Sequence, residues 1–345
     1  MRIGLIWTSY HYYLGEIARN ISETGISVTV YTYLDSKEIK PNLARIEFKD
    51  VGNYSNTELF NQITQDNHDV ILVCGWHLKP FRYLAKKFNG RVVLFMDNPW
   101  KKTFRQLLGI LIFRLKWSHY YDAAVVPGSP QKSFAKYLGF KENNIHDGFF
   151  SFLKQEKFHG VSINVRKEFI FIGRLIGWKG VSELINGYCN YRSKVSDPWP
   201  LIVCGEGPLR HLIENQPGVQ VKGFLNKIEL LNELRVPRVF ISCGKGEHWG
   251  ISIYEAAFFY HPLILSRDAG ATSEYLRDGC NGILIRGRNV KDIEQAMLKF
   301  HALRDSELDL YAKLSNKLAK KHDSNFFVTE VLPFISRGKM SDEYK

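Results

Sequence analysis

Short apolar runs typical of buried β-strands alternate with helical segments along most of the sequence. The first run, Arg2 to Trp7, is followed by a helical segment from Leu14 to Thr24, and then by a second run from Ser27 to Thr32. Apolar strands separated by helices indicate mainly parallel sheets covered on both faces, with ligands at the carboxyl ends of the strands. The other predicted strands are 70–74, 91–96, 123–126, 168–172, 201–204, 219–222, 239–243, 262–265 and 282–285, and the other predicted helices are 80–87, 103–117, 129–138, 181–191, 209–214, 228–234, 250–260, 290–303, 307–320 and 324–335.

A polar stretch from Ser151 to Lys167 interrupts this alternation. It carries several charges and has no clear period, so we interpret it as a linker. A chain of 345 residues is long enough for two domains, each with its own core. We therefore expect one α/β domain on each side of the linker.

Composition limits the classes of partner. The net charge of +12 and the aromatic share of 14% suggest an anionic partner, which can be nucleic acid, acidic lipid or a phosphorylated substrate. The five cysteines are scattered without a Cys-x-x-Cys pair, which favours buried thiols in a reducing compartment over disulfides or a zinc site. The amino-terminal apolar run is too short for a signal peptide, and no run is long enough to span a membrane. We expect a cytoplasmic protein, with peripheral attachment to the inner face of the cytoplasmic membrane as an alternative.

Two carboxylates stand eight residues apart in the segment Glu247-His-Trp-Gly-Ile-Ser-Ile-Tyr-Glu255. An apolar run, Val239 to Cys243, leads through a glycine-rich loop into a predicted helix that begins near Gly250. A strand, a loop and a helix N-terminus in this order leave backbone N–H groups directed at an anion. Glu247 in the loop and Glu255 two turns inside the helix could face one polyhydroxylated ligand, because carboxylates accept strong hydrogen bonds from hydroxyls. The alternative is a solvated loop acid and a helix acid in an ion pair.

Several segments of the second half, in order along the chain, resemble the motifs of the GT4-like family of retaining GT-B glycosyltransferases (glycosyl transferases group 1). The resemblance is dense from about residue 168 to 285 and thin in the first half. The segments are the two glutamates with seven residues between them, Phe171-Ile-Gly-Arg-Leu-Ile-Gly-Trp-Lys-Gly180, Leu201-Ile-Val-Cys-Gly-Glu-Gly-Pro-Leu-Arg210, Gly270-Ala-Thr-Ser-Glu274 and Asp278-Gly-Cys-Asn-Gly282.

The resemblance implies a GT-B fold, in which two Rossmann-like domains with parallel sheets face each other across a cleft. The N-terminal domain, 1–155, would bind the acceptor, and the C-terminal domain, 156–323, would bind the nucleotide-sugar. A final helix over 324–345 would pack back on the first domain. The implied activity is a retaining hexosyl transfer from a nucleotide-sugar, with UDP-sugars favoured over GDP- or ADP-sugars, to a glycan that we expect to be lipid-linked, as in polysaccharide or lipopolysaccharide biosynthesis.

Arg174 and Lys179 follow the strand that ends at Gly173. A bidentate guanidinium and a mobile ammonium form a suitable clamp for a departing diphosphate; the alternative is two surface cations near a helix start. No Asp-x-Asp and no His/Asp cluster accompanies them, so we expect no metal and no other cofactor, with the two cations in place of magnesium. The resemblance implies catalytic roles for Glu247, Arg174 and Lys179, and we add Asp97 as a fourth candidate. The expected donor contacts are Gly173, Arg174, Lys179, Gly205, Gly223, Phe224, Glu247, His248, Trp249, Gly250, Ile251, Ser252 and Glu255. For Gly205, Gly223 and Phe224 the alternative is simple turn chemistry.

The first half departs from the family pattern in two places. Where the first strand is usually followed by a Gly-Gly loop, this chain has Thr8-Ser-Tyr-His-Tyr-Tyr-Leu-Gly-Glu16. Its aromatic residues form either an acceptor platform, which we favour, or only a packed surface. After Met96 many relatives carry a histidine, whereas this chain has Asp97-Asn98-Pro99. The predicted acceptor contacts are His11, Tyr12, Gly15, Asp97 and Asn98.

The segment 101–117 combines an apolar centre, Leu107 to Phe113, with five flanking cations. A basic amphipathic helix of this kind can lie on an anionic bilayer; the equal alternative is a domain helix with one buried face. Two further functions stay open beside the transferase. One is a non-catalytic subunit that binds a nucleotide-sugar or a membrane, and the other, suggested only by the charge, is nucleic-acid binding. We expect no nucleic-acid partner, because no fold signature for one is present.

Overall fold

The computed structural model describes residues 1–33, 45–154 and 163–337. The chain divides into two compact units: Met1–Lys154 with His322–Lys345, and Gln155–Lys321. The end of the predicted final helix, 338–345, and the middle of the predicted linker, 155–162, lie outside the described residues. No described helix is both long enough and apolar enough to cross a membrane.

The N-terminal unit is built on a parallel sheet. Its strands lie in the order β3-β2-β1-β4-β5-β6-β7, so the chain starts in the middle and extends to both edges. Ile3 of β1 pairs with Val28 on one side and with Val70 on the other. The strands are β1 (Arg2–Trp7), β2 (Ser27–Thr32), β3 (Ile46–Asp50), β4 (Val70–Cys74), β5 (Arg91–Phe95), β6 (Ala123–Val126) and β7 (Ile145–Asp147).

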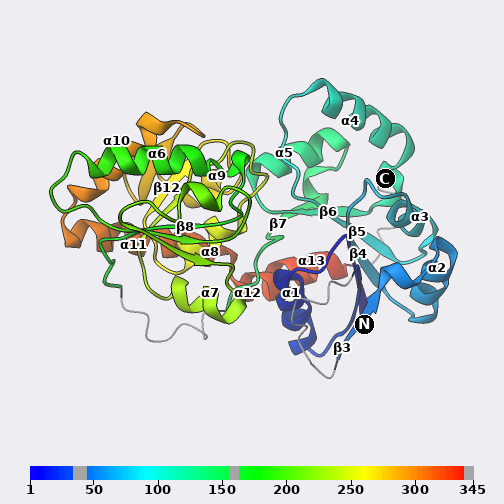
Figure 1. The fold of residues 1–345 in the computed structure, drawn as a ribbon. Helices are drawn as coiled ribbons and strands as arrows, with labels where there is room; N and C mark the ends of the chain where they lie inside the picture. The colour runs from blue at the N-terminus through cyan, green and yellow to red at the C-terminus, as the bar shows by residue number, and fades with distance from the viewer. Residues whose placement is uncertain (34–44, 155–162, 338–345) are drawn as a thin grey trace. The chain divides into compact units, whose positions relative to one another are not determined.

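Helices cover this sheet because its central strands are apolar on both faces. All five residues of β5 are buried, as are the last five of β1, so neither face can be left to water. The C-terminal helical segment contacts α1, and the two lie side by side in Figure 1. The helices are α1 (Tyr12–Glu23), α2 (Asn56–Gln65), α3 (Lys79–Lys87), α4 (Phe104–Lys116), α5 (Ser129–Leu138), α12 (Ser324–Phe326), the π-helical turn η8 (Phe327–Val331) and α13 (Leu332–Ser336).

The C-terminal unit repeats the design with a second parallel sheet. The strand order is β10-β9-β8-β11-β12-β13, again starting in the middle. Its core gathers side chains from the strands and from the helices that cover them, including Phe169, Tyr188 and Met297. The strands are β8 (Phe169–Ile172), β9 (Leu201–Cys204), β10 (Val219–Gly223), β11 (Val239–Ser242), β12 (Leu263–Ser266) and β13 (Gly282–Ile285).

The helices of this unit pack in pairs. Helix α6 lies against α10, and α8 lies against α11. Figure 1 shows the two pairs on opposite faces of the sheet. The helices are α6 (Val181–Arg192), α7 (Lys227–Leu234), α8 (Ile251–Phe258), α9 (Thr272–Tyr275), α10 (Val290–His301) and α11 (Asp305–Ala319). Both units therefore have the doubly wound parallel architecture that the alternation of strands and helices predicts.

One predicted helix is wrong, and four short elements were not predicted. The predicted helix 209–214 is only a short 3-10 turn, Arg210–Leu212. Two glycines and a proline precede it, at Gly205, Gly207 and Pro208, and they break the helical pattern. Strands β3 and β7 and helices α2 and α9 were not predicted. Strand β3 alternates charged and apolar residues at the sheet edge, and its weak apolar signal explains the omission.

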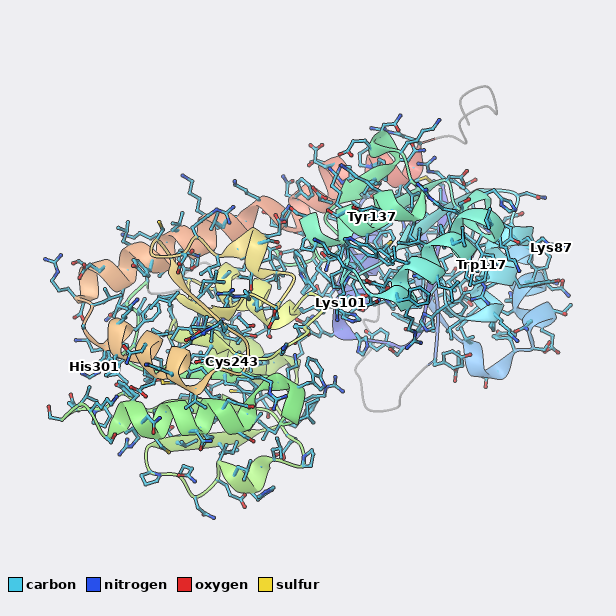
Figure 2. All side chains as sticks on the ribbon, turned by 90° about the horizontal axis from the view of Figure 1, so that it is seen from above. Lys87, Lys101, Trp117, Tyr137, Cys243 and His301 are labelled. Atoms are coloured by element: carbon cyan, nitrogen blue, oxygen red, sulfur yellow. The ribbon has the colours of Figure 1, made fainter. Side chains whose placement is uncertain are left out.

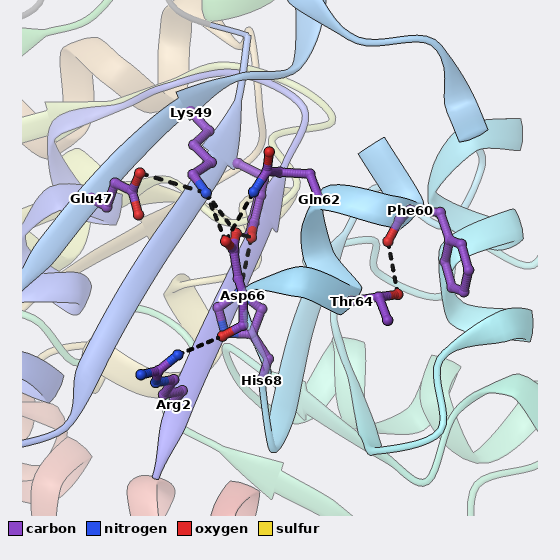
Figure 3. Close-up of polar contacts among 9 residues, drawn as sticks. Arg2, Glu47, Lys49, Phe60, Gln62, Thr64, Asp66 and His68 are labelled. Carbon is purple, nitrogen blue, oxygen red and sulfur yellow. Dashed lines mark hydrogen bonds and ion pairs between the residues drawn. The ribbon is translucent and has the colours of Figure 1, made fainter. Parts of the chain in front are cut away.

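A polar cluster in the N-terminal unit surrounds Asp66, at the end of α2 (Figure 3). Its carboxylate accepts two hydrogen bonds from Lys49, at 2.7 and 2.9 Å, one from Gln62 at 2.9 Å, and another from the Tyr31 hydroxyl. His68 lies 2.9 Å from that hydroxyl. Burial alone would raise the pKa of Asp66, but these hydrogen bonds outweigh it and hold the pKa below its ordinary value. The acid is thus fully supplied with donors by its own fold.

Candidate functional site

At the carboxyl edge of the C-terminal sheet, the loops after β8, β9 and β11 are joined by hydrogen bonds to one another and to the ends of β9 and β10. Backbone N–H groups of Gly173, Gly205 and Lys245 donate to Cys204, Gly223 and Trp178, at 3.0, 2.8 and 2.9 Å. The approach is so close that a Cβ atom on Gly205 would lie 1.9 Å from the Gly173 carbonyl oxygen. Only glycine fits there. The sequence motifs around these glycines therefore build one continuous loop surface.

Arg174 and Lys179 lie on this surface beside the same aromatic ring. The Arg174 guanidinium is 5.6 Å and the Lys179 ammonium 4.6 Å from the centre of the Trp178 ring. Cations are attracted to the face of an indole ring, so Trp178 holds the two charges near one another. Arg174 is exposed, and no carboxylate among the described residues pairs with it. Its guanidinium is thus available to an anion from solution.

Lys179 forms an ion pair with Glu247, which lies in the loop that follows β11. Both side chains are largely shielded from water, with exposed fractions of 17% and 16%. The carbonyl oxygens of Glu247 and Trp249 accept hydrogen bonds from the amides of Gly270 and Ala271, at 3.3 and 3.0 Å. The motif before α9 therefore holds the glutamate loop in place.

Helix α8 begins directly after this loop, at Ile251. Its N-cap, Gly250, has a φ of 99°, a left-handed conformation that favours glycine. No described residue accepts a hydrogen bond from the amides of Ile251 and Ser252. Helix N-termini with open N–H groups attract negative charge. The N-terminus of α8, which we call the helix mouth, can therefore bind an anion such as a phosphate.

Glu255 is buried one turn inside α8. Its exposed fraction is 3%, and no described residue offers it a hydrogen bond or a positive charge. Burial without a partner raises the pKa of its carboxyl to about 8. Positions 251, 252 and 255 share one helical face, and helical side chains lean toward the N-terminus. Glu255 thus stands on the same face of α8 as the first helical residues, and no described residue uses its hydrogen-bonding capacity.

The remaining predicted donor residues differ in accessibility. His248 and Phe224 are exposed, whereas Trp249 packs against Tyr275 in the interior, with ring centroids 5.8 Å apart. The prediction for Trp249 therefore concerns its backbone. Gly223 is the last residue of β10 and lies close to the Glu206 carboxylate, since a Cβ atom on Gly223 would be 2.8 Å from a carboxylate oxygen of Glu206.

The predicted acceptor residues lie in the N-terminal unit, after β1 and β5. His11 is exposed, is 3.0 Å from the Ser9 hydroxyl, and stacks on Tyr13. Tyr12 is half-buried with its ring edge on Phe152, while Gly15 is buried within α1. Of the neighbouring tyrosines, Tyr10 and Tyr13 are buried, so they belong to a packed surface and not to an exposed platform.

Asp97 and Asn98 follow β5 and are both half-buried. The carbonyl oxygen of Asp97 accepts a hydrogen bond of 3.2 Å from Gln131. Burial, together with the negative charge of Asp97, raises the pKa of the Cys74 thiol well above its ordinary value. Asp97 therefore lies at the carboxyl edge beside the end of β4.

The structure brings together Arg174, Lys179, Glu247 and the start of α8, all within the C-terminal unit. Sequence reasoning missed Trp178 as a member of this site. Trp178 stands four residues after Arg174 and one residue before Lys179. This position between two cations could have indicated its role. Among the described residues, no three His, Cys, Asp or Glu side chains gather as a metal site would require.

Comparisons with known proteins support the sequence resemblance. Residues 154–321 match the family model described as Glycosyl transferases group 1. An uncharacterized glycosyltransferase of Methanocaldococcus jannaschii, MJ1069, is 28% identical over 136 residues, which cover 37% of this chain. The match spans about a third of that relative's length, 34%. The predicted resemblance to glycosyl transferases group 1 is confirmed over residues 154–321, and a GT4-like family is consistent with this match.

Solved structures share the fold along nearly the whole chain. HepE of Anabaena, crystallised with UDP and glucose, is similar with a TM-score of 0.73 and 14% identity, over 97% of this chain and 99% of that one. A point mutant of TarM from S. aureus, crystallised with UDP, fondaparinux and a GlcNAc-glycerol, gives 0.73 and 12%, over 97% and 100%. At these identities the likeness establishes the fold alone. The predicted fold, two Rossmann-like domains of GT-B type, is confirmed.

Proposed function

Because residues 154–321 match the glycosyl transferases group 1 family model and the chain has a GT-B fold, we propose that this protein is a glycosyltransferase. It moves a sugar from a nucleotide-sugar to a glycan acceptor, with retention of configuration and without a metal ion. A UDP-sugar is the favoured donor, in line with the UDP named for HepE and TarM. The favoured acceptor is a lipid-linked glycan of the polysaccharide or lipopolysaccharide type.

The unpartnered Glu255 carboxyl is the observation that carries this proposal. A buried acid without donors costs stability, so a fold that retains one has a use for it. Vicinal hydroxyls of a ribose would supply two donors to a single carboxylate. The open amides of Ile251 and Ser252 lie about one helical turn before Glu255 on the same helix, where they could face a phosphate. Together they suit a nucleoside diphosphate.

Arg174 and Lys179 would stabilise the diphosphate as it leaves. Two cations and the helix mouth act on the oxygens where negative charge grows, which lowers the barrier to breaking the bond to the sugar. Lys179 pairs with Glu247 in the free protein, so a bound phosphate would draw the ammonium away from the carboxylate. Glu247 would then be released to accept hydrogen bonds from sugar hydroxyls.

The chemical step needs no protein nucleophile. The bond between the anomeric carbon and the phosphate oxygen breaks, and the acceptor hydroxyl bonds to that carbon on the same face. The acceptor proton passes to the leaving phosphate oxygen. In this scheme the protein supplies position and charge, with Asp97, Asn98, His11, Tyr12 and Gly15 as the proposed acceptor contacts.

A panel of UDP-, GDP- and ADP-sugars tests the proposal through nucleoside diphosphate release, with and without glycan acceptors. We expect one donor to be turned over, with EDTA having no effect. Arg174→Ala should lower kcat by about 100-fold or more, the usual cost of removing a charge-stabilising donor. Lys313→Ala, an exposed cation on α11, is the matched control and should leave kcat unchanged.

A non-catalytic subunit would give a different result. The aromatic stretch that replaces the expected Gly-Gly loop favours this second candidate. Under it, a nucleotide-sugar would raise the melting temperature, yet no donor would be consumed with any acceptor. If no sugar nucleotide binds, and Arg174→Ala and Glu255→Ala change nothing, both functions are wrong.

A further inference from the structure

Helix α4 carries a stripe of large apolar side chains on its solvent side. The stripe comprises Phe104, Leu107, Leu108, Leu111 and Leu115, whose exposed fractions range from 51% to 81%. At 100° per residue these five positions fall within about 100° of the helix circumference. They therefore form one continuous face and not scattered exposed residues.

The opposite side of α4 fixes this orientation. Ile110 and Phe113 are buried, and the Phe113 ring packs against Trp76 and Tyr121, with centroids 5.3 and 5.7 Å away. The Thr103 hydroxyl caps the helix by accepting a hydrogen bond from the Gln106 amide. The helix thus has two apolar faces, and the packed one prevents the stripe from turning inward.

Positive charges border the stripe. Arg105 and Lys116 lie on one side of it, Arg114 lies on the other, and Lys102 precedes the helix. All four are exposed, and no carboxylate among the described residues pairs with any of them. The sequence contains no Asp or Glu from residue 98 to 121. Lys101 and Trp117, which are labelled in Figure 2, flank α4 on its N-terminal and C-terminal sides.

We propose that α4 docks the protein on an anionic lipid bilayer. The stripe would enter the boundary between headgroups and acyl chains, while the bordering cations would meet lipid phosphates. A second copy of the chain is a poor occupant, because two such faces would bring like charges together without an acid to compensate. This docking is independent of the proposed transferase activity.

Vesicle sedimentation with the full chain tests the proposal. We expect binding to vesicles of 70% phosphatidylcholine and 30% phosphatidylglycerol, little binding to phosphatidylcholine alone, and weakening as salt rises. The triple variant Phe104→Ser, Leu108→Ser, Leu111→Ser should lower the partition coefficient at least about tenfold. Arg105→Gln, Arg114→Gln, Lys116→Gln should lower it about 100-fold, since each surface cation is worth about fivefold.

Matched controls come from the C-terminal unit. Leu310→Ser removes an apolar residue that is 63% exposed on α11, and Lys291→Gln, Lys313→Gln, Lys317→Gln removes the same amount of charge. Both should bind vesicles as the natural chain does, and unchanged melting temperatures would show that all variants fold. The proposal is overturned if the natural chain ignores anionic vesicles, if the stripe variant binds equally well, or if Leu108→Ser instead abolishes dimers.

Discussion

Asp66 in the N-terminal unit and Glu255 in the C-terminal unit are both shielded from water, but only Asp66 has hydrogen-bond partners among the described residues. Asp66 accepts hydrogen bonds from Lys49, Gln62 and Tyr31, and its pKa lies below the ordinary value. Glu255 has no such partner among the described residues, and burial raises its pKa to about 8. A satisfied acid stabilises the fold, whereas an unsatisfied one weakens it and is available to a ligand. The contrast separates a structural cluster from a candidate binding site.

The largest expected effect concerns ligand binding. Glu255→Gln should weaken UDP binding by about 100-fold, because two hydrogen bonds to a charged group contribute roughly 3 kcal/mol together. Asp66→Asn should leave the affinity unchanged. Isothermal titration calorimetry of both variants checks this. Equal losses in the two variants would erase the distinction between the clusters.

For the free energy of unfolding we expect the opposite order, with the larger effect at Asp66 and none at Glu255. Asp66→Ala leaves Lys49 with only its 3.5 Å ion pair to Glu47 and should lower the free energy of unfolding by about 2 kcal/mol. The loss is smaller than for a fully buried pair because both groups retain some contact with water. Glu255→Gln should cause no loss, since it replaces an unpartnered acid with a neutral side chain. Urea unfolding followed by circular dichroism measures both, and a strong destabilisation by Glu255→Gln would contradict the assignment.

The two acids should also give stability slopes of opposite sign. Glu255 titrates near 8 when folded and near 4.5 when unfolded, so its burial lowers stability as the pH rises between these values, by up to about 1.4 kcal/mol per pH unit. The folded pKa of Asp66 is below 3.8, so its contribution is complete above pH 3.8 and is lost as the pH falls through the folded value.

Unfolding curves of the natural chain, Glu255→Gln and Asp66→Asn from pH 3 to 9 resolve these contributions as differences. The gap between the natural chain and Glu255→Gln should change above pH 5, and the gap to Asp66→Asn should change below pH 4. A flat difference for Glu255→Gln would mean that its carboxyl has donors after all.

A smaller effect is expected at Trp178. Its ring holds Arg174 and Lys179 together, and an exposed cation–π contact contributes about 0.5–1 kcal/mol. Trp178→Ala should therefore weaken UDP binding about threefold, while Tyr137→Ala, an exposed aromatic of the other unit, should have no effect. Titration of both variants with UDP at low and high salt measures the change in affinity. An unchanged affinity for Trp178→Ala would show that the ring does not contribute to binding.

Much of the fold was predictable because buried strands have a distinctive apolar sequence. The predicted segments 201–204, 123–126 and 129–138 coincide with β9, β6 and α5. Edge strand β3 was not predicted, because one of its faces is polar. The site loops were predictable from glycines whose spacing only close backbone approach explains, as at Gly205. The burial of Glu255 was not predictable, because the sequence around a helical glutamate does not indicate which face of the helix is covered.

Proton release on UDP binding tests the central claim most directly. If ribose hydroxyls donate to Glu255, a carboxyl with a pKa of about 8 must ionise as the ligand binds. Calorimetry at pH 7.5 in buffers of different ionisation enthalpy should then show most of one proton released by the natural chain and none by Glu255→Gln. Tight binding with no proton released, or the same release from Glu255→Gln, would contradict the account.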